Sequence, residues 1–202
     1  MGMKVQVKTL KDDTPRMKEA MDGLRGKVVN VGVLSGEHAW LASIHEYGCK
    51  ITPRGQYLTI PCNSKAVGRS ARDFPDLFFL RTKEGNKFLV RNKGKDQIEF
   101  MFMLAKEVNI PERSFLRAGF DQHHEEVLKK AQRLMKPLMD GSLSPDDYCD
   151  AVGQLLSDKI KNFARQLNSP PKSNITLAAN PNKANPLVQT GDMIGSITWE
   201  VK

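Results

Sequence analysis

The chain has 202 residues, of which 40% are hydrophobic and 27% are charged. These values are ordinary for a soluble globular chain with an apolar core. No apolar run approaches the length of a membrane span, so we expect no membrane partner. The N-terminus has no apolar signal core and the three cysteines are scattered, which favours a protein that stays in a reducing cytoplasm.

The net charge of +8 is unevenly spread. Between Ser64 and Lys95, nine lysines and arginines stand against three acidic residues, so this segment alone carries +6. Such a segment could contact phosphates or an acidic surface. We favour a solvated hairpin edge, because Phe74, Phe78 and Phe79 are grouped like core residues and not interleaved with the basic ones. The possible interface residues are Arg69, Arg72, Arg81, Lys83, Lys87, Arg91, Lys93 and Lys95.

The first part of the chain predicts a strand, a helix and a second strand. Apolar and polar residues alternate over residues 3–7, as they do in a half-buried strand. Pro15 favours the first turn of a helix, which the apolar stripe carries to Leu24. Residues 27–34 then predict a strand with three valines on one face. A second helix is expected over residues 38–47.

Four short apolar runs separated by turn residues predict strands over 57–61, 77–81, 88–91 and 98–104. The last three of these form a β-meander. The segment from Ile98 to Val108 is almost continuously apolar, and we expect one buried strand that runs straight into a helix at Pro111. That helix reaches Met135, and its apolar stripe comprises Leu116, Phe120, Val127, Ala131 and Leu134.

The last part of the chain predicts a helix, a loop and a strand. Ser144 and Pro145 form a helix start, and the apolar period continues to Leu167. Residues 168–185 lack periodic apolar residues and predict a long mobile loop. A short capped turn and a final strand over residues 197–201 complete the chain.

Together these elements predict an α+β fold, in which a small antiparallel sheet, the β-meander, packs against two to four helices. A long mobile loop precedes the C-terminal strand. We expect a single domain over residues 1–202, with a β-hairpin-rich insertion near 57–104 and a flexible loop near 168–185.

One cluster of residue types suggests metal chemistry. His45 and Glu46 resemble half of a metalloprotease motif, but Cys49 stands where the second histidine would be. A His/Cys site of His45, Cys49 and Cys62 would lack the close paired spacing of zinc ligands. We favour a half-buried His45 and a Glu46 that caps or pairs locally.

The remaining polar clusters have simpler explanations. His123 and His124 are consecutive, so on a helix they point about 100° apart and cannot share one ion from one face. Asp146 and Asp147 fit the positive end of a helix dipole, and Asp150 follows them. We therefore expect no catalytic site, no enzyme activity, no metal and no cofactor.

Three short patches carry more information in combination than any one does alone. They occupy residues 44–48, 110–116 and 186–197. They read hydrophobic-x-Glu-aromatic-Gly, Ile-Pro-x-Arg-x-Phe-Leu and Pro-Leu-x-x-Thr-Gly-x-Met-x-x-Ser-Ile. The motif residues are Ile44, Glu46, Tyr47, Gly48, Ile110, Pro111, Arg113, Phe115, Leu116, Leu187, Thr190, Gly191, Ser196 and Ile197.

In type and order, these patches resemble the motifs of the neck and tail-completion proteins of tailed bacteriophages. Ser114 stands where that family has a proline, and the meander is longer than in its compact members. The resemblance implies a structural virion protein made in the bacterial host cytoplasm. It also implies a homo-oligomeric ring, expected to be a hexamer, at the top of the tail. Its partners would be the tail tube or tail terminator and the head-connector proteins, with possible transient passage of DNA.

Two rival functions remain open. The first is a basic nucleic-acid-binding module that uses residues 64–95, which would lose DNA affinity steeply with salt. The second is an enzyme with a centre of His45, Glu46 and Cys49, which would retain metal in stoichiometric amount.

Overall fold

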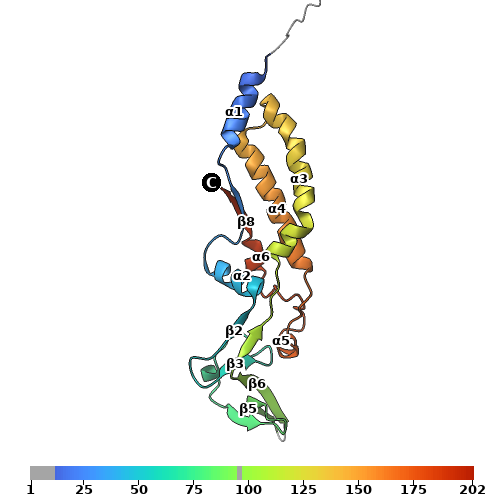
Figure 1. The fold of residues 1–202 in the computed structure, drawn as a ribbon. Coiled ribbons are helices and arrows are strands. Elements are labelled where there is room, and N and C mark those ends of the chain that lie inside the picture. Colours follow the sequence, from blue (N-terminus) through green and yellow to red (C-terminus); the bar gives the residue numbers. More distant parts are fainter. Residues whose placement is uncertain (1–11, 95–96) are drawn as a thin grey trace, which may run out of the picture.

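A computed structural model of the chain describes residues 12–94 and 97–202. The strand expected over residues 3–7 lies outside the described residues. Within them, the fold combines six α-helices with antiparallel sheets, so the predicted α+β class is confirmed. The molecule is elongated, with long helices at one end and the largest sheet at the other (Figure 1).

Three helices form the helical end: α1 (Thr14–Leu24), α3 (Leu116–Asp140) and α4 (Pro145–Gln166). Helix α4 begins as predicted, because the Ser144 hydroxyl accepts a hydrogen bond from the Asp147 N–H at 3.0 Å. Helix α3 ends at Gly141, which adopts a left-handed conformation. The short connection between them makes α3 and α4 antiparallel neighbours (Figure 1).

Two strands from opposite ends of the described chain lie against α4. Strand β1 (Val29–Gly32) pairs antiparallel with β8 (Thr198–Val201). Helix α4 accommodates Trp199 of β8 at Gly153, where an added Cβ would lie 2.5 Å from the indole. The indole N–H donates to Asp150 at 3.0 Å, so this acidic residue has a structural partner.

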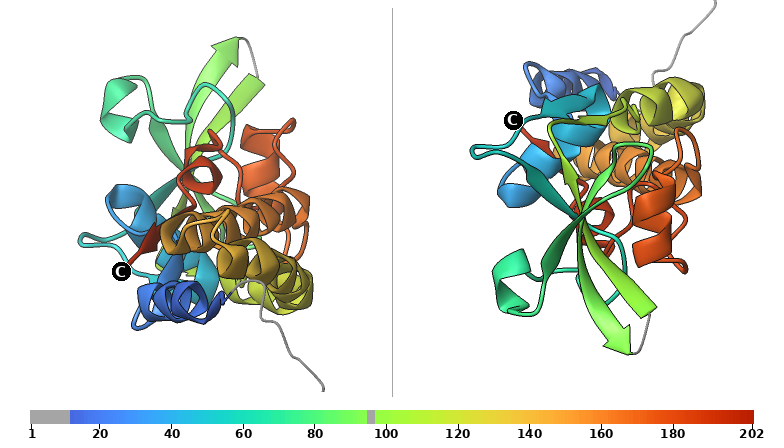
Figure 2. Two further views of the ribbon diagram at one scale, coloured as in Figure 1. Left: turned by 90° about the horizontal axis from the view of Figure 1, so that it is seen from above. Right: turned by 90° about the horizontal axis from the view of Figure 1, so that it is seen from below.

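The predicted meander forms most of a four-stranded sheet with the strand order β3-β6-β5-β4. Strands β5 and β6 project to one side of the helices when the molecule is viewed along its length (Figure 2). The bounds are β3 (Leu58–Pro61), β4 (Phe78–Arg81), β5 (Lys87–Gly94) and β6 (Gln97–Ala105).

The expected single strand from Ile98 to Val108 is wrong. Strand β6 ends at Ala105, and exposed Lys106 and Glu107 separate it from β7 (Val108–Ile110). Strand β7 belongs to another sheet, because it pairs with β2 (Cys49–Ile51), which directly follows helix α2 (Glu37–Tyr47). Two charged residues in the apolar run thus mark a change of sheet.

The expected helix start at Pro111 is also wrong. Helix α3 begins at Leu116, and residues 111–115 form an irregular link between β7 and α3. Proline is compatible with a helix start but equally with extended chain. Here the backbone of the link is held by contacts to α2.

The apolar core is divided into two clusters. The larger joins α2, the start of α3, α4 and the C-terminal segment, and comprises Ala42, Phe115, Ile160, Ala164, Leu187, Met193, Ile194 and Ile197. The smaller lies under the four-stranded sheet and comprises Ala66, Phe74, Met101 and Phe102. It is covered by the segment with the 3₁₀ turn Ala71–Asp73. Each end of the molecule therefore has its own apolar support.

The predicted loop over residues 168–185 contains helix α5 (Asn174–Ala179), so a segment without secondary structure was the wrong expectation. Ser173 caps α5, and Ala179 is buried. Six residues are too few to display a helical period, which explains why the sequence gives no signal. The mobility of this segment stays a prediction. A second short helix, α6 (Asp192–Gly195), precedes β8.

Candidate functional site

The three sequence patches meet at one place, where α2 ends and α3 begins. Glu46 is the centre of this junction, and this residue is only 1% exposed. One carboxylate oxygen accepts the N–H of Leu116 at 2.9 Å, and the other accepts the N–H of Arg117 at 3.1 Å. The Ser114 hydroxyl and the Arg117 guanidinium each donate to the same carboxylate at 2.9 Å. Glu46 therefore caps a helix that begins 70 residues later.

This arrangement corrects the expectation that Glu46 caps or pairs locally. Its partners come from α3 because α3 presents unpaired N–H groups and the positive end of its dipole. Burial raises the pKa of Glu46, but the hydrogen bonds from Leu116, Arg117 and Ser114 outweigh burial and hold the pKa below its usual value. The carboxylate is thus ionised and fully used in structure.

Gly48 brings the first and second patches into direct contact. It has φ of 72°, and an added Cβ would lie 2.9 Å from both the Ile110 carbonyl oxygen and the Glu112 nitrogen. The next link is a hydrogen bond of 2.7 Å from the Arg113 N–H to the His45 carbonyl. Only glycine fits here, because both the backbone angle and the close approach exclude a side chain.

The other motif residues of the first two patches differ in exposure. Ile44 is buried, whereas Tyr47 is exposed and lies under the Arg117 guanidinium at 4.8 Å. Pro111 is exposed, and Phe115 is completely buried in the larger core cluster.

The third patch packs on Phe115 from the C-terminal side. Leu187 and Ile197 are buried in the same cluster. Gly191 begins α6 with φ of 101°, and the Thr190 hydroxyl accepts the Asp192 N–H at 3.4 Å. The Ser196 hydroxyl donates to the Met193 carbonyl at 2.8 Å. The patches separated in sequence therefore form one packed junction.

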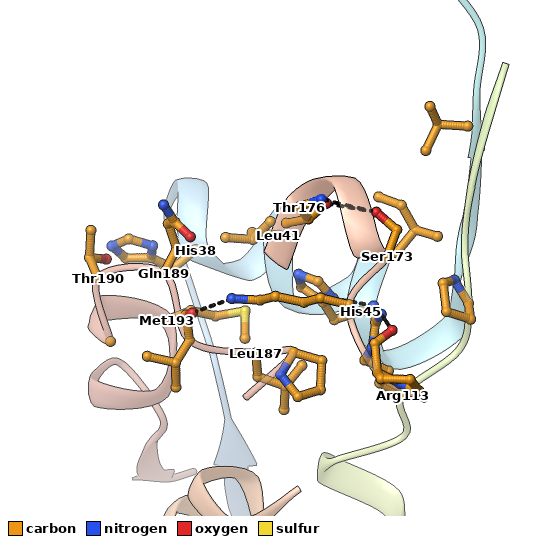
Figure 3. Close-up of a pocket in the computed structure, with 18 of the residues that line it drawn as sticks. His38, Leu41, His45, Arg113, Ser173, Thr176, Leu187, Gln189, Thr190 and Met193 are labelled. Atoms are coloured by element: carbon orange, nitrogen blue, oxygen red, sulfur yellow. Dashed lines mark hydrogen bonds between the residues drawn. The ribbon is translucent and has the colours of Figure 1, made fainter. Parts of the chain in front are cut away.

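A pocket of about 730 Å³ lies beside this junction (Figure 3). Helix α2 contributes His38, Leu41 and His45, and β7 contributes all three of its residues. The opposite wall comes from the segment between Pro171 and Met193. The pocket was not predicted, because part of its wall (Pro171, Lys172, Ser173 and Thr176) lies in the segment expected to be a loop.

Two buried or half-buried cations line the pocket. Arg113 is 6% exposed, and its guanidinium donates to the carbonyls of Pro170 at 2.7 Å and Pro171 at 3.0 Å. The Lys172 ammonium donates to the carbonyls of Lys183 at 2.8 Å and Val188 at 2.7 Å. These bonds hold the segment with α5 against the junction.

His45 is the third polar group at this wall, and its ring nitrogen lies 3.5 Å from the Arg113 guanidinium. Burial lowers the pKa of His45, and the charges of Arg113 and Lys172 lower it further. Burial also lowers the pKa of Lys172, with the charges of Lys183 and Arg113 adding to the effect. The wall of the pocket therefore carries an excess of positive charge.

The sequence candidates for metal chemistry lie apart. Among residues 12–94 and 97–202, no three His, Cys, Asp or Glu side chains are grouped so that they could hold a metal ion. The thiols of Cys49 and Cys62 each point to a backbone carbonyl at 3.6 Å. His123 lies 3.9 Å from Glu126, and His124 bonds the Asp121 carbonyl at 2.8 Å.

The acidic cluster at the start of α4 has structural partners. Asp146 pairs with Lys27, and the Asp147 carboxylate accepts the Ser144 hydroxyl at 2.7 Å.

The basic segment is only partly available for an interface. Arg69 lies over the Phe74 ring at 4.3 Å, and Lys87 donates to the Tyr57 hydroxyl. Arg91 pairs with Glu99 at 2.7 Å. In the described part of the chain, no ion pair involves the side chains of Arg72, Arg81, Lys83 or Lys93, whereas Lys95 lies outside that part.

Phe74, Phe78 and Phe79 were all expected in the core, and this expectation is wrong for two of them. Phe74 is buried, but Phe78 is 39% and Phe79 is 55% exposed. Phe78 and Phe79 are consecutive in β4, so they point to opposite faces of the sheet. The register places Phe79 beside Leu89 and two residues from Arg81, whereas Phe78 is beside Val90.

The face of the sheet that carries Phe78 also carries five more apolar side chains, and sequence reasoning missed this group. We define the apolar sheet face by the register: Phe78, Leu80, Phe88, Val90, Ile98 and Phe100. Phe88 and Phe100 pack edge to face at 5.0 Å, yet Phe100 is 41% and Ile98 is 46% exposed. Three of the six, Phe78, Ile98 and Phe100, are exposed, and exposed apolar side chains grouped on one face are typical of a contact surface.

A comparison with known proteins gives no match, whether with family models, curated proteins or solved structures. None of the helices in the described residues combines the length and apolar character that a membrane span requires.

Proposed function

We propose that this chain is a structural virion subunit of a tailed bacteriophage, of the tail-completion or head–tail connector kind. It assembles into a homo-oligomeric ring, expected to be a hexamer, at the top of the tail. Its neighbours there are the tail tube or tail terminator protein and the head-connector proteins. The chain is made in the host cytoplasm and acts in the virion without catalysis.

The observation that carries this proposal is the apolar sheet face. Ile98 and Phe100 of β6 are nearly half exposed. Strand β6 lies at the end of the molecule that is far from the long helices (Figure 1). Burial of exposed apolar side chains is the main driving force of protein association. A face of this kind on one side of an elongated subunit suits a ring, in which each copy contacts the next by a different surface.

The motif residues support the same role. Glu46 and Gly48 are fully used in holding α2 to α3, and Phe115 and Ile197 are buried in the core. These residues therefore preserve a shape. That is what a subunit with a fixed place in an assembly requires.

Native mass spectrometry of three chains tests the ring. The double variant Ile98→Ser, Phe100→Ser replaces the two most exposed side chains of the apolar sheet face, and Leu128→Ser replaces an apolar side chain that is 57% exposed on α3. We expect a defined oligomer for the parent chain and for Leu128→Ser, and a monomer for the double variant. An oligomer that survives in the double variant contradicts the role of this face. Monomers of all three chains, alone and with purified tails, contradict the ring.

One observation favours a nucleic-acid-binding module as the second candidate. Phe79 is 55% exposed on the face that also carries Arg81 and Lys87, so an aromatic residue does stand among basic ones. This module predicts that affinity for single-stranded DNA falls steeply with salt and that Phe79→Ala weakens it. Native mass spectrometry distinguishes the two candidate functions, since DNA binding through the face that carries Phe79 requires no ring.

A further inference from the structure

The pocket beside the junction has no role in the ring proposed above. We propose that it binds a carboxylate carried by an extended peptide segment of a partner protein. The pocket is separate from the apolar sheet face, so the proposal of a peptide ligand can be right or wrong independently of the proposed ring.

The first argument is an excess of positive charge. Arg113 and Lys172 both line the pocket, and among the described residues no carboxylate lines it. The acidic residues next to His45 and Arg113 in the sequence are used elsewhere, because Glu46 and Glu112 both bind Arg117, at 2.9 and 2.7 Å. Charged side chains are rarely buried unless they are paired. A carboxylate from outside would supply the missing partner.

The second argument is the remaining hydrogen-bonding capacity. A guanidinium has five N–H donors, and Arg113 directs two to carbonyls and one towards His45. An ammonium has three donors, and Lys172 directs two of them to carbonyls. Both residues therefore retain N–H groups for a ligand, and charge-assisted bonds to a carboxylate are the strongest that they can form.

The third argument concerns the rest of the pocket. All of β7 and the following Pro111 line it, whereas no residue of β2 does. Among the residues that the structure describes, β7 pairs only with β2, so its other edge has no strand partner. An extended peptide can add to such an edge through main-chain hydrogen bonds. Apolar Leu41, Leu187 and Met193 remain for its side chains (Figure 3).

Three pools of acetylated hexapeptides test the site, each with mixed valine, leucine and isoleucine at the apolar positions. The first has one internal glutamate and an amidated end, the second has glutamine instead, and the third has a free C-terminal carboxylate. Fluorescence anisotropy of labelled pools measures affinity. An NMR titration of the His45 ring shows whether a negative charge arrives beside it.

We expect each carboxylate pool to bind at least roughly tenfold more tightly than the glutamine pool. Whichever of the two binds better identifies a side-chain or a terminal carboxylate as the source. Binding should raise the pKa of His45, because the carboxylate offsets the charges of Arg113 and Lys172, the two cations that face its ring. Lys172→Met should remove the preference, whereas Lys93→Met, which changes an exposed lysine of β5, should keep it.

Equal affinity for all three pools, or no binding by any, would overturn the proposal. So would a preference that survives in Lys172→Met. If inorganic phosphate binds as tightly as the peptides, the pocket is a site for small anions, and the proposal of a peptide ligand is wrong. If Arg113→Ala fails to fold, Lys172→Met still decides, because its loss leaves the bonds of Arg113 to residues 170 and 171 in place.

Discussion

At the scale of single residues, the junction depends on groups with several partners each. Glu46 accepts four hydrogen bonds from residues 114–117, and Arg117 donates to Glu46 and to Glu112. Gly48 makes the contact possible by its lack of a side chain. The sequence indicates that Glu46 and Gly48 matter together, but not why, because Glu46 finds its partners about 70 residues away.

The variant Glu46→Gln tests this role through its dependence on pH. The pKa of Glu46 is lower in the folded chain than its ordinary value, so the unfolded state takes up the proton first as the pH falls. The stabilisation by the carboxylate is therefore complete above about pH 5 and is lost as the pH falls through the folded pKa.

Glu46→Gln removes the carboxylate and should lower the free energy of unfolding by about 1–3 kcal/mol at pH 7. The difference in unfolding free energy between variant and parent should shrink below about pH 4. Urea unfolding at several pH values measures this. Glu37→Gln, an exposed change in the same helix, serves as the control and should show no such difference. A cost for Glu46→Gln that is constant from pH 7 to pH 3 would contradict the account.

At the scale of elements, the sequence predicts what local signals determine. Ser144 and Pro145 begin α4 as expected, and the turn residues separate β4, β5 and β6 as expected. Strands β2 and β7 escape prediction because three residues show no period, and each needs the other as its partner. Helix α5 was not predicted because its segment is held by hydrogen bonds from Arg113 and Lys172 to backbone carbonyls, and no local sequence pattern indicates such bonds.

The helix start at α3 offers a matched pair of phenylalanines. Phe115, which directly precedes α3, is completely buried among Ala42, Ile160 and Leu187, whereas Phe120 in the first turns of α3 is 47% exposed. Phe115→Ala should cost about 3–5 kcal/mol through lost burial and the cavity that remains. That cost lowers the melting temperature by roughly 6–20 °C for a chain of this size.

Phe120→Ala should change stability by about 0.5 kcal/mol, as surface substitutions usually do. Calorimetry of both variants measures the difference. Equal melting temperatures of the two variants would mean that Phe115 does not anchor the junction.

At the scale of the whole molecule, two apolar clusters support two ends with different surfaces. The helical end and the junction hold the shape, and the four-stranded sheet lies at the far end (Figures 1 and 2). The total charge of +8 gives no sign of this face, because composition does not distinguish the two sides of a strand. Only the register brings Phe78, Phe88 and Phe100 together.

The central claim is that the chain is a structural part of a tailed phage particle. Immunogold electron microscopy tests it most directly, on particles released from the cells in which the gene is naturally expressed, with an antibody raised against the purified chain. We predict gold label at one position, where the tail meets the head, on intact particles, and none along the tail or on the capsid. Particles without label, with all of the chain left in the soluble fraction, would contradict it.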